Sequence, residues 1–98
     1  MQVEFRDKKL EEIYYTWKSK KFSDEIIIKF IQKINILKNI FNINDLLNLR
    51  SLHFEKLKNY KTWDYSIRVN KSYRIVFNII WNEIKIIEVI ELSNHYNN

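Results

Sequence analysis

The 98-residue chain contains no cysteine, no glycine and no proline. Without cysteine it can form no disulfide framework, no thiolate zinc site and no thiol nucleophile. Without glycine and proline, its turns must rely on asparagine and aspartate, whose short side chains bond to nearby backbone groups. The chain also lacks the apolar run of roughly 20 residues that spans a membrane, and its first residues lack the apolar core of a signal peptide. We therefore expect a cytoplasmic protein that spans no membrane.

The composition is that of a globular protein. Hydrophobic residues make up 46% of the chain and charged residues 30%, which separates it from disordered sequences. The length suits one domain over residues 1–98 with a single modest core. The formal net charge is +5, which suits an acidic partner such as nucleic acid, a membrane surface or an acidic protein.

Hydrophobic periodicity predicts one short strand and two helices in the N-terminal half. Residues 2–5 favour a strand with Val3 and Phe5 inward. Asp7 and Ser23 are suitable caps for the two helices that follow. The apolar face of the first helix is predicted to hold Leu10, Ile13, Tyr14 and Trp17. The buried stripe of the second is predicted to hold Ile27, Phe30, Ile31, Ile34, Leu37 and Phe41.

The C-terminal half alternates apolar and polar residues with the period of two that is typical of half-buried strands. Residues 63–69 and 73–79 predict a hairpin. Its apolar residues share a face only if the loop holds an odd number of residues, such as 70–72, with one residue near the left-handed region that asparagine tolerates. This register places Arg68 directly opposite Arg74 on the other face.

A short extended piece within 52–57 and a more apolar strand over 83–92 complete the pattern. Parity puts Glu88 on the core side, and Glu91, Ser93 and His95 on the face of the two arginines. The order β-α-α-β-β-β predicts an α+β fold, in which two N-terminal helices pack on a small antiparallel sheet of about four strands. The opposite face of the sheet stays partly open.

Two arginines directly opposite each other repel. They splay into water, pair with a nearby carboxylate, or bind an anion such as phosphate. With Glu55, His95, Lys56 and Lys58 nearby, this face carries the groups that RNA cleavage needs: a base for the 2′-OH, a cation for the phosphorane charge and an acid for the 5′-oxygen. The spacing of histidines and carboxylates predicts no metal site.

Each candidate residue also has a purely structural interpretation. Glu55 could be a solvated carboxylate paired with Lys58, and His95 a surface histidine at a strand end. His53 could act as a general base or simply pack. Tyr96 could stack on an RNA base or lie in an unordered terminus.

Segments of the C-terminal half resemble the RelE/ParE superfamily of bacterial type II toxins, and most of all its HigB and YoeB branches. The segments are Glu55-Lys-Leu-Lys58, Tyr65-Ser-Ile-Arg-Val-Asn70, Tyr73-Arg-Ile-Val-Phe77 and the terminal His95-Tyr96. Their spacing from Glu55 to Arg74 matches the YoeB pattern without gaps. Many HigB members carry histidine where Glu55 stands, and His53 lies two residues earlier.

The resemblance implies a metal-independent mRNA endonuclease that acts in the ribosomal A site, leaves a 2′,3′-cyclic phosphate and uses no cofactor. Carried over by position, Glu55 would be the general base, Arg74 would stabilise the transition state and His95 would be the general acid. The residues that would bind the substrate are Arg68, Lys56, Lys58, Tyr96 and His53, the last being an alternative base.

The partners implied by the resemblance are mRNA, ribosomal RNA and a cognate antitoxin that covers this face, with no membrane partner. One alternative is a ParE-like toxin that inhibits DNA gyrase without nuclease activity. Another is a regulatory binding protein that keeps only the fold.

Overall fold

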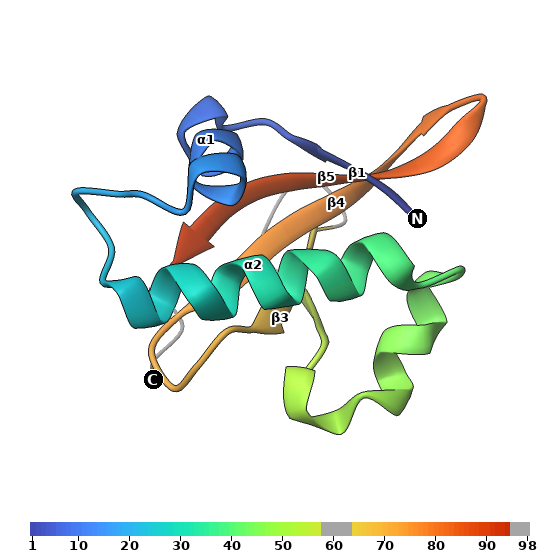
Figure 1. The fold of residues 1–98 in the computed structure, drawn as a ribbon. Helices are drawn as coiled ribbons and strands as arrows, with labels where there is room; N and C mark the ends of the chain where they lie inside the picture. Colours follow the sequence, from blue (N-terminus) through green and yellow to red (C-terminus); the bar gives the residue numbers. More distant parts are fainter. Residues whose placement is uncertain (58–63, 95–98) are drawn as a thin grey trace.

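The computed structural model describes residues 1–57 and 64–94 and shows helices packed over one face of a twisted sheet (Figure 1). The helical elements are α1 (Lys8–Thr16), α2 (Asp24–Asn39) and the short 3-10 helices η1 (Ile43–Asn48) and η2 (Arg50–Leu52). The strands are β1 (Gln2–Phe5), β2 (Glu55–Leu57), β3 (Asp64–Arg68), β4 (Arg74–Asn82) and β5 (Ile84–Ser93). The predicted α+β architecture is confirmed.

The sheet has the strand order β1-β5-β4-β3-β2, one strand more than expected. Residues 55–57 form the additional strand because they pair antiparallel with β3. The sheet is also mixed, since β1 runs parallel to β5. One core joins the helices to the covered face of the sheet. Its fully buried members include Phe30, Ile34 and Leu37 of α2 and Ile67, Ile75, Phe77, Ile87 and Val89 of the strands.

Both helices begin at the predicted caps. The side chain of Asp7 accepts a hydrogen bond from the Lys9 amide at 2.9 Å, and that of Ser23 accepts one from the Ile26 amide at 3.3 Å. These bonds satisfy amides that have no partner within the helix.

Two residues predicted to lie on the buried helix faces are exposed instead. Trp17 is 53% exposed and Phe41 is 97% exposed. Trp17 follows the last residue of α1 in a left-handed conformation, with φ 63°. Phe41 follows Ile40, where the backbone has become extended. The 3.6-residue period ends with the helix, so neither side chain continues its stripe.

The predicted hairpin between β3 and β4 forms with the expected register. Arg68 lies directly opposite Arg74, and residues 70–72 make the loop. No residue of this loop has a positive φ, contrary to expectation. Instead, the side-chain oxygen of Asn70 accepts hydrogen bonds from the amides of Ser72 and Tyr73, both at 2.8 Å. An asparagine side chain thus closes a turn that has no glycine to help it.

A β-bulge in β5 reverses the predicted position of Glu88. Phe77 pairs with Val89 but Val76 pairs with Glu91, so Ile90 is an extra residue on β5. Residues before the bulge therefore face the opposite way from a regular strand. Glu88 points away from the core, where it forms an ion pair with Arg6 at 2.7 Å. The expectation that Glu88 lies on the core side was wrong.

After the bulge, β5 follows the predicted parity. Ser93 lies opposite Arg74, and Glu91 lies opposite Val76. Residues directly opposite in neighbouring strands point to the same face. Glu91 and Ser93 therefore share the face of the arginines, as expected.

Substitution of Asn70 tests whether its side chain closes the hairpin loop. Asn70→Ala removes two hydrogen bonds to backbone amides, and we expect the free energy of unfolding to fall by about 1–2 kcal/mol. Asn70→Asp keeps the acceptor oxygen and should lose clearly less. Urea denaturation of both variants measures the difference. Equal losses would show that the side-chain acceptor does not hold the loop.

Candidate active site

The face of the sheet turned away from the helices carries two adjacent rows of paired residues. One row runs through Arg68, Arg74 and Ser93. The next runs through Glu55, Ser66, Val76 and Glu91. Because partners across a sheet point to one face, Glu55 lies on the same face as both arginines. The structure thus brings together three of the residues proposed from the sequence.

Arg74 is half-buried, and its guanidinium group is held at several points. Its Nε donates to the Ser66 hydroxyl at 2.8 Å, and its Nη2 donates to the Ser66 carbonyl at 3.4 Å. The same Nη2 also donates to the carbonyl of His53. Ser66 is fully buried. These bonds orient the guanidinium group before any ligand is bound.

Arg68 is held by different partners. Its Nε donates to the carbonyl of Asn70 at 3.1 Å, and its Nη1 lies 3.1 Å from His53 Nε2. A guanidinium group can only donate, so this contact is a hydrogen bond in which His53 Nε2 is the acceptor. Within residues 1–57 and 64–94, Arg68 has no carboxylate partner. One of the three interpretations was that a nearby carboxylate neutralises the opposed arginines. For Arg68, no carboxylate of the described residues does so.

His53 contacts both arginines because of its backbone conformation. It ends η2 with φ 45° and ψ 52°, and its amide donates to the Arg50 carbonyl at 3.1 Å. A residue other than glycine is uncommon in this left-handed region. Here the conformation directs the carbonyl of His53 to Arg74 and the ring to Arg68. His53 therefore gives each arginine a separate acceptor.

The remaining predicted residues lie in different places. Glu55 is exposed on β2. Lys56 pairs with Tyr65, so the alternation of the strand directs it to the face opposite Glu55. Lys58, His95 and Tyr96 lie outside the described residues. The described chain ends one residue after Ser93, the β5 partner of Arg74.

Sequence reasoning assigned Ser66 no role of its own, although it belongs to the segment Tyr65–Asn70 that resembles the toxins. His53 was a candidate base or substrate-binding residue, but its two contacts with the arginines depend on a conformation that no sequence pattern signals. The available signal for Ser66 was its place two residues before Arg68, which puts it diagonally across from Arg74.

The assembled groups suit anion binding and proton transfer. The arginines can stabilise negative charge on phosphate, and the exposed carboxylate of Glu55 can accept a proton. In the part of the chain that the structure describes, no three histidine or carboxylate side chains gather as metal ligands.

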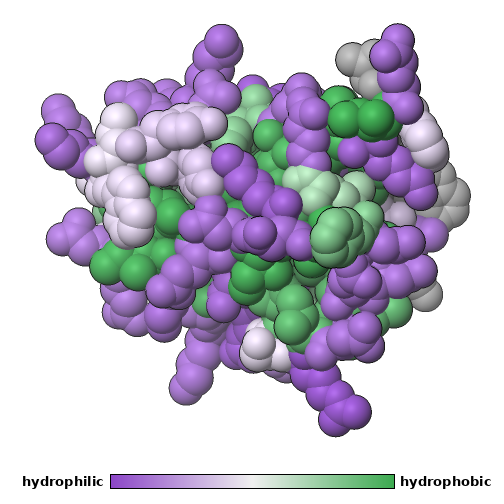
Figure 2. Space-filling model, turned by 45° about the vertical axis from the view of Figure 1, so that its right-hand side comes forward, coloured by the Kyte–Doolittle hydropathy of each residue, from purple (hydrophilic) through white to green (hydrophobic). Residues whose placement is uncertain are grey.

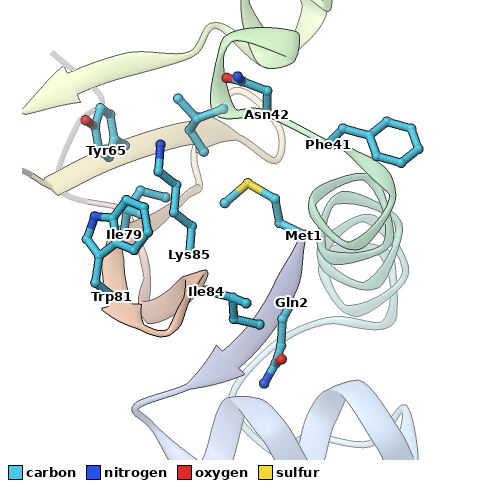
Figure 3. Close-up of a pocket in the computed structure, with 10 residues that line it drawn as sticks. Met1, Gln2, Phe41, Asn42, Tyr65, Ile79, Trp81, Ile84 and Lys85 are labelled. Atoms are coloured by element: carbon cyan, nitrogen blue, oxygen red, sulfur yellow. The ribbon is translucent and has the colours of Figure 1, made fainter.

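A pocket at the far end of β4 is lined by both apolar and polar residues, and none of the candidate site residues lines it. It has a volume of about 550 Å³ and is lined by Met1, Phe41, Trp81, Ile84 and Lys85, among others (Figure 3). Trp81 lies seven residues after Arg74 on β4, a separation of roughly 23 Å. Figure 2 brings the right-hand side of Figure 1 forward. On the face that it shows, apolar side chains gather among projecting hydrophilic ones. The candidate site is therefore at the arginine end of the sheet.

A family model and a solved structure match the chain. Residues 3–93 match the HigB-like toxin family, described as the RelE-like toxin of the type II toxin-antitoxin system HigB. Among solved structures, the chain is similar to a YoeB/ParE toxin from Agrobacterium tumefaciens. The TM-score is 0.56 and the identity 20%, over 98% of this chain and 100% of the other. No curated protein matches the chain by sequence.

Removal of the Ser66 hydroxyl tests how Arg74 is anchored. Ser66→Ala leaves Arg74 Nε without its buried acceptor, and we expect the free energy of unfolding to fall by about 1–3 kcal/mol. Ser51→Ala changes an exposed serine and should stay within about 0.5 kcal/mol of the parent. Denaturant unfolding compares the two. A Ser66 variant as stable as the Ser51 variant would contradict the anchoring role.

Proposed function

Because the chain belongs to the HigB-like family of RelE-like toxins of type II toxin-antitoxin systems, we propose that it is a ribosome-dependent endoribonuclease that cleaves mRNA. A type II toxin has a cognate antitoxin as its partner. The observation that carries the proposal is the pair of opposed arginines, each held by its own hydrogen bonds, with Glu55 on the same face of the sheet.

In the proposed reaction, the ribose 2′-oxygen attacks the adjacent phosphorus while the bond to the 5′-oxygen breaks. Glu55 takes the proton of the 2′-OH, and His95 gives a proton to the leaving 5′-oxygen. The products are a 2′,3′-cyclic phosphate and a 5′-OH end. Arg74 stabilises the charge that develops on the phosphate oxygens, and preorganised cations of this kind commonly supply the largest part of a rate enhancement.

The contacts of His53 support Glu55 as the base. His53 Nε2 lies 3.1 Å from Arg68 Nη1, so the contact with this guanidinium group occupies that ring nitrogen. A ring nitrogen occupied in this way is less available to take up the proton of the 2′-OH. Glu55 is exposed and acceptor-only when ionised, so it meets the requirement.

The other proposed contacts concern the bound RNA. Arg68 binds the phosphate beside Arg74, and Tyr96 stacks on or orients the substrate. The positive net charge attracts ribosomal RNA, and the message is cut in the ribosomal A site. We propose the cytoplasm as the location, because ribosomes and mRNA are there, and the antitoxin as an inhibitor that covers this face.

No helix in the described part of the chain is both long enough and apolar enough to cross a membrane.

The second candidate function is inhibition of DNA gyrase. It is considered because the similar solved structure carries the combined name YoeB/ParE toxin. A binding inhibitor needs no base and no phosphate-stabilising cation, whereas this face carries both. Supercoiling by purified gyrase should therefore be unchanged when the protein is added.

Replacement of Arg74 tests the nuclease activity. Arg74→Ala removes the cation at the scissile phosphate, and we expect cleavage to fall by about 10²–10³-fold. Mapping of mRNA 5′ ends after induced expression, together with growth measurements, reports the loss. Arg6→Ala is the matched control, because it removes an arginine whose only described ion pair is with Glu88. If Arg74→Ala cuts mRNA and arrests growth like the parent, the nuclease proposal is wrong.

A second pair of variants separates the two candidate bases. Glu55→Gln removes the proton acceptor without changing the shape of the side chain, and the cleavage rate should fall by about 10²–10⁴-fold. His53→Asn removes the imidazole while tolerating the left-handed backbone, and its loss should be smaller. Single-turnover cleavage on programmed ribosomes measures both rates. A larger loss for His53→Asn would reassign the base.

A further inference from the structure

A second pocket, lined mostly by polar residues, opens beside the arginine pair at the edge of the sheet. β2 pairs with Asp64–Ser66 only, so the last two residues of β3 extend past it. A pocket of about 550 Å³ lies there, between the first half of α2, the end of η2 and the hairpin loop. The polar residues that line it include Glu25, Lys29, His53, Arg68, Asn70 and Lys71.

The charges of this pocket favour an anion. Lys29, Arg68 and Lys71 contribute three positive charges, and Glu25 contributes one negative charge. Lys29 Nζ lies 3.1 Å from Glu25 Oε1, with 41% and 72% of the two side chains exposed. An exposed ion pair of this kind is weak, so a phosphate can compete with Glu25 for Lys29.

Arg68 connects this pocket to the candidate active site. Arg68 is one of the residues that line the pocket, and across the hairpin it lies opposite Arg74. An RNA strand held at Arg74 can therefore reach this pocket by way of Arg68. We propose that this pocket binds a backbone phosphate of the mRNA next to the one that is cut, through Lys29 and Lys71. The inference rests on the proposed function, because the ligand is the same RNA.

The proposal can be tested by removing the two lysine charges from the protein and single phosphate charges from the RNA. The probe is an mRNA fragment on programmed ribosomes, with 2′-deoxyribose at the cut position so that no cleavage occurs. In separate fragments, single phosphates that flank this position are replaced by uncharged methylphosphonates. Affinities are measured for the parent, for Lys29→Ala/Lys71→Ala and for Lys85→Ala, a control whose lysine lies beside Trp81 at the far end of the sheet.

We expect the double variant to bind the charged fragment about tenfold more weakly than the parent, while Lys85→Ala binds like the parent. One methylphosphonate position should weaken the parent by a similar factor and have little further effect on the double variant, because the two changes remove the same contact. The inference is overturned if the double variant binds like the control, or if it keeps full sensitivity at every flanking phosphate.

A variant that is expected to tighten RNA binding, in contrast to the lysine variants, completes the test. Glu25→Gln removes the negative charge of the pocket and should tighten binding several-fold at low salt, an effect that screening reduces at high salt. Unchanged or weaker binding would contradict the inference. Cleavage of unmodified message by the parent reports on the nuclease alone. If the protein shows the phosphate coupling but does not cleave unmodified message, the nuclease proposal is wrong and the inference about this pocket still holds.

Discussion

Two arginines placed directly opposite each other across a hairpin are the constraint on which the rest of the site depends. The register of β3 and β4 forces Arg68 and Arg74 onto one face, where their charges repel. Each arginine is held by hydrogen-bond acceptors of its own, which keep the two guanidinium groups in place despite this repulsion. Ser66 and the His53 carbonyl hold Arg74, while the His53 ring and the Asn70 carbonyl hold Arg68. Two oriented cations then lie side by side on a surface that also carries Glu55.

The β-bulge at Ile90 makes this arrangement compatible with a packed core. Before the bulge, Ile87 and Val89 of β5 face the helices. After it, Ser93 faces the side of Arg74, while Leu92 returns to the core. One extra residue thus allows a single strand to serve the core along most of its length and to approach the site with polar residues at its end.

Much of the fold could be predicted because strand and helix periods are local properties of the chain. The caps at Asp7 and Ser23, the three-residue hairpin loop and the opposition of Arg68 and Arg74 all follow from spacing. The errors arose where an element ended or its parity changed. Trp17 and Phe41 lie beyond the ends of their helices, and Glu88 lies before a bulge that alternation cannot reveal.

For the candidate site, the sequence by itself determined which residue types share one face of the sheet, because alternation along β3 and β4 requires it. The sequence resemblance also indicated the family to which the chain belongs. Only the tertiary structure decided how the arginines are held and that residues 55–57 pair with β3, which directs Lys56 to the other face. The reason is physical: the partners of Arg74 come from β3 and from the residue after η2, and packing between distant segments, not local spacing, sets those contacts.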